Sequence, residues 1–312
     1  MNDIYLTVLI PFYNEEGSLE KLWLELQPVL EKLKKNYEVI LINDGSNDGS
    51  HAIAQKLVKN NNFIKLIHNG HNQGKAAVLQ QGFNAAVGEF VVTMDADLQD
   101  DPKEITRLLK AIGDKNCDLV SGWKKSRHDP WHKVIPSFFF NGMIRKFSGV
   151  GLHDINCGLK IYRKAVIKSV SIYGELYRFI PVLAVNKGFK VDEIVVNHRE
   201  RQFGQSKYGI SRFIRGFLDL LTVIFVTKFL KRPLHLFGPI GLTLFGVGVI
   251  ILGYLSYLHY AEGQSIGERP LLIFGVMFVI AGLQIFFTGL IAELITYYAQ
   301  TNLNKQKREA QN

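Results

Sequence analysis

The sequence predicts an α/β domain with a mainly parallel sheet, followed by two C-terminal transmembrane helices. Between residues 5 and 122, short apolar runs rich in β-formers alternate with segments of helical periodicity. From about residue 233 onward the chain is largely apolar, in segments longer than the ~20 residues that a helix needs to cross the hydrocarbon core. The alternating part predicts a sheet covered by helices on both faces.

Each element of the α/β part has its own signal. Leucines at positions 19, 22, 26 and 30 recur at helical spacing, and Asp101–Pro102 is a typical helix start. The expected strands are residues 5–10, 37–43, 63–68, 89–95 and 117–122. The expected helices are residues 18–35, 48–60, 74–87 and 101–112. In such sheets, ligands bind beyond the carboxyl ends of the strands.

The apolar segments, residues 234–258 and 271–298, predict a transmembrane hairpin. The link between them is short, whereas the outer flanks are basic, through Lys228, Lys231, Arg232, Lys305, Lys307 and Arg308. By the positive-inside rule, both termini and the α/β domain are cytosolic, and the membrane is the plasma membrane if the source is bacterial. The alternative is a buried hairpin of a large soluble protein.

Two further segments, residues 135–147 and 210–229, alternate aromatic and basic residues and predict helices in the membrane surface; buried core helices are the alternative. The expected boundaries are an α/β domain at 1–209, an amphipathic helix at 210–232, the hairpin at 233–300 and a basic tail at 301–312. A net charge of +9 favours anionic partners, and its position ahead of the hairpin favours lipid and phosphorylated substrates over nucleic acid.

The sharpest local pattern is Asp95-Ala96-Asp97, which follows the apolar run of residues 89–93. Two carboxylates in such a turn can share Mg²⁺ or Mn²⁺, which usually also bind substrate phosphates. A solvated acidic turn is the alternative. Asp44 follows another strand and could accept a hydrogen bond from a nucleobase, although turn and capping roles explain it equally well. The cysteines, two in number, predict neither a disulfide framework nor a zinc site.

Together these motifs resemble the family 2 glycosyltransferases of the GT-A fold, an α/β, Rossmann-like architecture. The resemblance rests on residues 11–16 (PFYNEE), 43–46 (NDGS), 72–75 (NQGK) and 95–99 (DADLQ). Residues 154–160 (DINCGLK), 199–208 (RERQFGQSKY) and the two-span tail resemble more narrowly the polyprenyl-phosphate glycosyltransferases, which include dolichyl-phosphate mannose synthase and bactoprenol glucosyltransferase.

The resemblance implies a role for each matching residue. Asp95, Asp97 and Gln99 would hold the metal and the donor diphosphate, and Asp97 and Asp154 would be catalytic. The nucleotide sugar would contact Pro11, Tyr13, Glu15, Asp44, Lys75, Asp95, Arg199, Arg201 and Lys207. The acceptor phosphate would contact Lys124, Arg127, Lys133 and Ser137.

The implied reaction is an inverting transfer from a nucleotide sugar, a UDP-sugar before GDP-mannose, to undecaprenyl or dolichyl phosphate. A lipid phosphate is already ionised, so the transfer needs no strong general base; a sugar hydroxyl would need one, and Asp154 is then the candidate. The alternatives are a polysaccharide synthase, a non-catalytic nucleotide-sugar sensor or scaffold, and, from charge alone, a nucleic-acid binder. Glu293 inside the second span and the Gly-rich spans make a homo-oligomer plausible.

Overall fold

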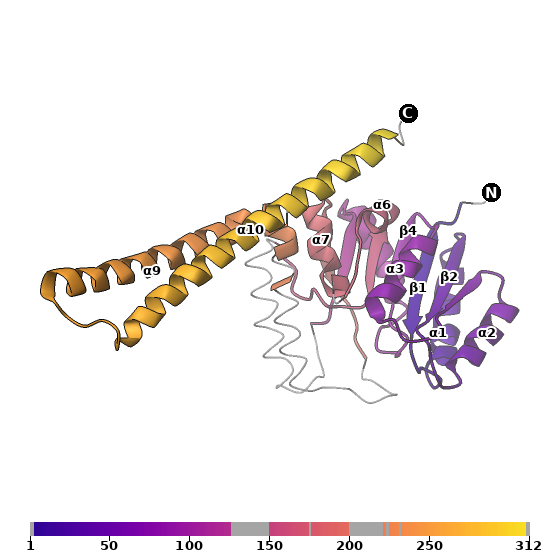
Figure 1. Cartoon of the computed structure of the whole chain (residues 1–312). Coiled ribbons are helices and arrows are strands. Elements are labelled where there is room, and N and C mark those ends of the chain that lie inside the picture. Colours follow the sequence, from indigo (N-terminus) through magenta and orange to yellow (C-terminus); the bar gives the residue numbers. More distant parts are fainter. Residues whose placement is uncertain are drawn as a thin grey trace. The chain divides into compact units, whose positions relative to one another are not determined.

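The computed structural model describes residues 3–125, 150–174, 176–199, 221–222, 225–230 and 232–309. It divides into two compact units, Met1–Val223 and Ile224–Asn312. The first is the α/β domain and the second contains the apolar hairpin (Figure 1). The expected surface helix at 135–147 lies outside the described residues, as does most of the one at 210–229.

Among the described residues, the strands form one sheet in the order β3-β2-β1-β4-β6-β5-β7. Neighbours pair in parallel except at β6, which is antiparallel to both β4 and β5. The expected mainly parallel sheet is therefore confirmed. The strands are β1 (Leu6–Phe12), β2 (Tyr37–Asn43), β3 (Ile64–His68), β4 (Phe90–Thr93), β5 (Leu119–Trp123), β6 (Lys160–Arg163) and β7 (Val191–Val195).

Helices cover both faces of this sheet because alternate strand residues point to opposite sides. Val8, Val39 and Leu41 share a core cluster with apolar residues of α1 (Leu19–Lys32), α2 (Ser50–Asn60) and α4 (Glu104–Asp114). On the other face, Gly82 of α3 lies against Leu9 and Ile42. The remaining helices of this unit are α3 (Lys75–Ala85), α6 (Lys164–Ser169), the 3₁₀ turn η1 (Leu176–Phe179) and α7 (Ile180–Asn186).

Expected and observed boundaries differ for local reasons. Helix α1 ends at Lys32, three residues before the expected end, and Lys34 then adopts a left-handed φ of 52°. The helix expected from Asp101 begins at Glu104, because the Asp101 carboxylate accepts the backbone N–H of Lys103 at 3.0 Å and forms a turn instead. Strands β6 and β7 were not expected; the four residues of β6, with basic ends, give little periodicity.

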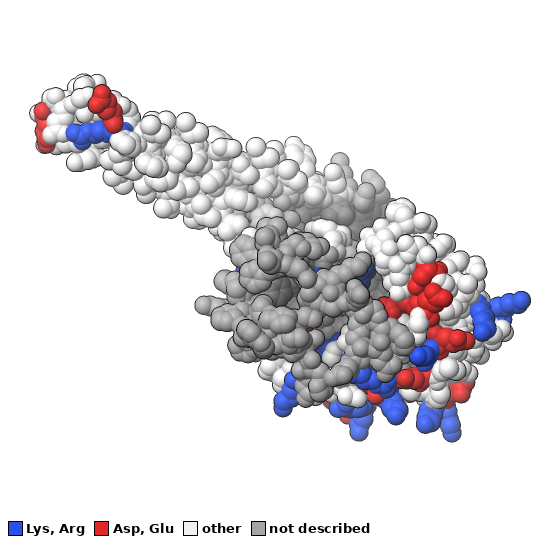
Figure 2. Space-filling view, turned by 90° about the horizontal axis from the view of Figure 1, so that it is seen from below, with Lys and Arg blue, Asp and Glu red and all other residues white. Residues whose placement is uncertain are grey.

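In the second unit, α9 (Leu234–Glu262) and α10 (Pro270–Glu309) run side by side, preceded by a π-helical turn, η2 (Phe225–Phe229). Both helices are long and apolar enough to cross a membrane, as expected. In Figure 2, Lys, Arg, Asp and Glu gather on the α/β unit and at the loop end of the hairpin, while the visible hairpin face between them is uncharged. The second unit therefore has the length and composition of a membrane-spanning hairpin.

Close glycine contacts hold the two helices together. A Cβ atom on Gly241 would lie 2.7 Å from Gly282 O, and one on Gly248 would lie 2.7 Å from Val279 N. Glu293 of α10 accepts the backbone N–H of Leu234, at the start of α9, at 3.1 Å. These glycines and Glu293 thus serve contacts within the hairpin, and the expected homo-oligomer stays a prediction.

Candidate active site

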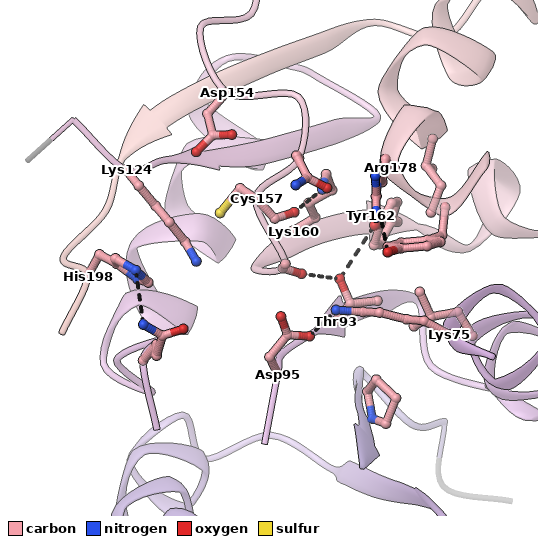
Figure 3. Close-up of a pocket in the computed structure, with 17 residues that line it drawn as sticks. Lys75, Thr93, Asp95, Lys124, Asp154, Cys157, Lys160, Tyr162, Arg178 and His198 are labelled. Atoms are coloured by element: carbon pink, nitrogen blue, oxygen red, sulfur yellow. Dashed lines mark hydrogen bonds and ion pairs between the residues drawn. The ribbon is translucent and has the colours of Figure 1, made fainter. Parts of the chain in front are cut away.

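A polar pocket of about 240 Å³ lies where β1 and β4 end and β6 begins (Figure 3). The site is at this edge because β1 and β4 are parallel, so their carboxyl ends meet, while antiparallel β6 starts there. Its walls carry lysines, carboxylates and aromatic rings: Pro11, Lys75, Leu79, Thr93, Asp95, Gln99, Lys124, Asp154, Asn156, Cys157, Gly158, Lys160, Tyr162, Tyr177, Arg178, Ile180 and His198.

Asp95 follows β4 and forms an ion pair of 2.5 Å with Lys75, the first residue of α3. Burial raises the pKa of Asp95, but the charge and hydrogen bond of Lys75 outweigh it and hold this pKa below its ordinary value. The pair is half-buried, and a Cβ on Gly158 would lie 2.5 Å from the Asp95 carboxylate. Because residue 158 is a glycine, the Asp95 carboxylate can occupy the space that a side chain at 158 would fill.

Asp97 lies in the same turn. It is not one of the described residues that line the pocket. Its side chain is buried and accepts the backbone N–H of Gln99 at 3.2 Å. Leu98 between them has φ 61°, an uncommon conformation for a branched side chain and one that tends to occur at functional sites.

The turn nevertheless fits a divalent cation. The described residues contain no cluster of three or more His, Cys, Asp or Glu side chains suited to a metal. Mg²⁺ and similar ions need fewer protein ligands when substrate phosphates complete their coordination. Asp95, Asp97 and Gln99 carry the hard oxygen atoms that such an ion prefers, and their role as metal ligands stays a prediction.

Lys124 and Asp100 form a second ion pair, at 3.1 Å, beside the pocket. Asp100 is 1% exposed, and His198 lies 4.0 Å from the same carboxylate oxygen. Burial lowers the pKa of Lys124, but the negative charge of Asp100 outweighs it and raises this pKa strongly. Of the expected acceptor-phosphate residues, Lys124 is at the pocket, and Arg127, Lys133 and Ser137 lie outside the described residues.

Asp154 is 2% exposed and lines the pocket close to Cys157 and Lys160 (Figure 3). Burial raises the pKa of the Cys157 thiol to about 12, so this thiol stays protonated near neutral pH. Lys160, Tyr177 and Arg178 were not expected as site residues. Lys160 belongs to the segment 154–160 that carries the family resemblance, whereas nothing in the sequence distinguishes Tyr177 or Arg178.

The residues expected at the nucleotide occupy neighbouring positions at the same edge. Pro11 lines the pocket, Tyr13 is exposed, and Glu15 accepts the Ser18 hydroxyl at 2.6 Å. The Asp44 carboxylate accepts the backbone N–H groups of Gln73 at 2.7 Å and Gly74 at 3.1 Å. Asp44 therefore fixes the loop that leads to Lys75, and its contact with a nucleobase stays a prediction.

Arg199 lies on a different cavity, of about 450 Å³, formed with α1 and the start of α4. Its guanidinium pairs with Glu25 at 2.6 Å and with Asp101 at 3.0 Å, and its backbone N–H donates to Gln99 O at 2.9 Å. In this structure Arg199 fastens residues 196–199 to the Asp97–Asp101 loop. Arg201 and Lys207, expected beside it at the donor, lie outside the described residues.

Comparison with known proteins agrees with this geometry. The family profile described as Glycosyl transferase family 2 matches residues 7–171. The chain belongs to glycosyl transferase family 2. A second profile, described as GtrB C-terminal hairpin, matches residues 232–297 of this glycosyltransferase and covers all of α9 and much of α10.

Relatives resemble this family 2 enzyme over nearly their whole length. The dodecaprenyl-phosphate galacturonate synthase of Rhizobium johnstonii is 38% identical over 96% of the chain and 90% of that protein. The undecaprenyl-phosphate 4-deoxy-4-formamido-L-arabinose transferase of Aeromonas hydrophila is 34% identical over 93% of the chain and 87% of that protein. Both names describe sugar transfer involving a polyprenyl phosphate.

Solved structures share the fold. Glucosyl-3-phosphoglycerate synthase of Mycobacterium tuberculosis superposes with a TM-score of 0.56 at 15% identity, over 72% of this chain and 80% of that one. The same enzyme with Mn²⁺ and UDP-glucose gives 0.54 at 16% identity, over 72% and 79%. The expected GT-A-like fold of this glycosyltransferase is confirmed.

Proposed function

We propose that this family 2 glycosyltransferase moves a sugar from a UDP-sugar to a polyprenyl phosphate, with inversion at the anomeric carbon. The observation that carries the proposal is that the similarity to two polyprenyl-phosphate sugar transferases spans both the α/β unit and the hairpin. A cationic pocket and an apolar hairpin in one chain suit an acceptor that is both a phosphate and a lipid. A polysaccharide synthase would use the same fold but a hydroxyl acceptor.

Asp95, Asp97 and Gln99 would hold Mg²⁺ or Mn²⁺, which supplies positive charge to the donor diphosphate. The oxygen ligands of the turn support this, as does the related fold crystallised with Mn²⁺ and UDP-glucose. Asp44, Pro11, Tyr13 and Glu15 would form the nucleoside end of the site. Lys75 contacts Asp95 directly, so it would orient that carboxylate and add charge beside the diphosphate.

In the transfer, an ionised oxygen of the lipid phosphate attacks the anomeric carbon. The bond from that carbon to the nucleoside diphosphate breaks, and its electron pair leaves with the diphosphate. Lys75 and Lys124 line the pocket and would stabilise this charge electrostatically. Asp154 faces the same space and would stabilise positive charge that develops at the anomeric carbon. Arg127, Lys133 and Ser137 would bind the acceptor phosphate together with Lys124.

We infer that the α/β unit and both ends of the hairpin face the cytosol. The support is the distribution of charge: basic residues flank the hairpin at 228–232 and 305–308, whereas the link carries Glu262, Glu268 and Arg269. Impermeant labelling of cysteines introduced into the link and the tail measures this orientation.

The test is transfer by the detergent-purified full chain. Undecaprenyl phosphate, Mn²⁺ and radiolabelled UDP- and GDP-sugars, UDP-galacturonate among them, are supplied one donor at a time. We expect label from one UDP-sugar in the organic phase, lost on chelation with EDTA and restored by Mn²⁺. Asp97→Asn should lower the rate about 100-fold or more, and Asp114→Asn, on the exposed end of α4, should not. Nucleotide binding without lipid labelling from any donor would exclude a polyprenyl-phosphate acceptor.

A further inference from the structure

Lys160 is a buried cation at the start of β6, on the wall of the pocket. Its backbone is held on both sides, opposite Thr93 of β4 and Ser121 of β5. Its side chain is only 3% exposed. Central strands are among the most rigid parts of a domain, so the backbone that carries Lys160 is held firmly beside the pocket.

Lys160 differs from the two other lysines of the pocket. Lys75 is paired with Asp95 at 2.5 Å and Lys124 with Asp100 at 3.1 Å. The Lys160 ammonium donates a hydrogen bond to the carbonyl of Cys157, a neutral acceptor. Within the part of the chain that the structure describes, no carboxylate lies within ion-pair distance of it. Its remaining N–H donors are available to a ligand.

Such a cation is costly without a negative partner. Burial lowers the pKa of Lys160, and the nearby charge of Lys75 lowers it further, against the opposing influence of Asp154 and Asp95. A buried charge that gains a hydrogen-bonded anion recovers much of this cost. The position of Lys160 is therefore suited to an anion that arrives from solution.

The surroundings of Lys160 are also cationic. Arg178 of η1 lines the same pocket (Figure 3), and its guanidinium lies 5.4 Å from the centre of the Tyr177 ring. The Lys75 ammonium lies 5.6 Å from the same ring. Positive groups thus stand on several sides of one pocket, which favours an anionic ligand over a neutral one.

We propose that Lys160 binds an anionic oxygen of the donor substrate, either a phosphate oxygen or the carboxylate of an acidic sugar. The inference rests on the proposed function, because it places a nucleotide sugar in this pocket. It assigns a binding residue that the expected set lacked. The phosphate and the sugar carboxylate share the same chemistry, because each is an oxyanion that accepts hydrogen bonds from the lysine N–H groups. Binding measurements distinguish between them.

The experiment compares the binding of UDP, UDP-glucose and UDP-glucuronate, with Mn²⁺ present, by isothermal titration of the full chain in detergent. Lys160→Met removes the charge, and Lys160→Gln removes the charge but keeps a donor toward Cys157. Lys110→Met, on the exposed side of α4, is the matched control. Only variants whose melting temperature equals that of the wild type are included, so that a loss of binding does not reflect unfolding. We expect Lys160→Gln to weaken binding about tenfold to a hundredfold, with the control unchanged.

The pattern across ligands identifies the anion. An equal loss for all three assigns a phosphate oxygen, and a loss confined to UDP-glucuronate assigns the sugar carboxylate. Unchanged affinity for all three ligands in a folded Lys160 variant overturns the inference alone. If neither the wild type nor Lys110→Met binds any of them, the proposed function fails as well.

Discussion

Buried charges in the α/β unit occur mostly in groups that neutralise one another. Asp100 lies against Lys124 and His198 in the site. Glu38, at the other end of the sheet, accepts hydrogen bonds from the Thr7 hydroxyl at 2.7 Å, Lys65 at 2.7 Å and the Val87 backbone N–H at 3.0 Å. Groups of this kind contribute to folding, whereas Lys160 has no such carboxylate among the described residues and is available for binding.

Glu38→Gln should therefore destabilise the α/β unit. Burial raises the pKa of Glu38, but the bonds from Lys65, Val87 and Thr7 outweigh it, and the pKa lies below its ordinary value. Loss of the charge should cost about 1–3 kcal/mol at pH 7. Melting in detergent, followed by circular dichroism, should show a fall of several degrees, on the order of 2–4 °C per kcal/mol.

The same variant predicts a pH dependence. A carboxylate with a lowered folded pKa contributes stability that is present above its unfolded pKa and is lost as pH falls through the folded value. The difference between wild type and Glu38→Gln should thus stay nearly constant from pH 7 to about pH 5 and shrink as the pH falls below about 4. Glu89→Gln, with an exposed side chain, should melt like the wild type throughout. A difference that stays constant with pH would contradict a role for the Glu38 charge.

At the scale of elements, short contacts join segments that are distant in sequence. The Asp97–Asp101 loop is fastened by residues 197–199, through the antiparallel bridge of Asp100 with His198 and the bond from Arg199 N–H to Gln99 O. The Asn197 backbone N–H also donates to Glu104 at 3.3 Å. The turn that bears the candidate metal ligands thus depends on the chain that follows β7.

The hairpin is an element whose packing depends on individual glycines. A Cβ on Gly282 would lie 2.5 Å from Phe245 N and 2.7 Å from Gly241 O, both backbone atoms that cannot move aside cheaply. Gly253, on α9, has nothing within 4 Å of the same added atom. Close approach of two helices through small residues is a common basis of packing in membranes.

Gly282→Ala should accordingly weaken the hairpin by about 1–3 kcal/mol through overpacking. Gly253→Ala should be neutral or slightly stabilising, because alanine favours the helix where space allows. Thermal stability in detergent, measured by the fraction that stays monodisperse after heating, compares the two. Equal stability changes in the two variants would contradict a specific packing role of Gly282 between the helices.

At the scale of the whole molecule, a soluble-type enzyme unit and a membrane hairpin form one chain, and the relatives match across both. Apart from Glu293 within α10, the charged residues of the hairpin lie at its two ends, which predicts where the membrane lies. The native thiols, Cys117 and Cys157, are both buried, so cysteines introduced at exposed sites report on topology.

Single cysteines at the two ends of the hairpin should label oppositely. In intact cells, a membrane-impermeant maleimide should label Ser265→Cys in the link but leave Asn302→Cys unlabelled until the cells are lysed. Both positions are exposed in the structure, so accessibility to the reagent differs only through the membrane. The reverse pattern would place the α/β unit outside the cell and would separate it from cytosolic nucleotide sugars.

The sequence by itself determined the alternation of strands and helices, the two apolar helices and the position of Asp95 directly after a strand. Each of these depends on the pattern of residues along one segment, because burial on one face leaves a period in the sequence. Asp154, in contrast, was expected only from the family resemblance of residues 154–160. The sequence did not predict the antiparallel strand β6, because its four residues are too few to show a period.

Only the tertiary structure decided what several charged residues contact. It brings Lys160, Tyr177 and Arg178 into the pocket with Asp95, and it pairs Arg199 with Glu25 across 174 positions of sequence. It also engages Asp44 with the loop before α3, while leaving its role toward a nucleotide open to test. Such partners depend on which elements the fold places together, and a long-range electrostatic contact leaves no local pattern in the sequence.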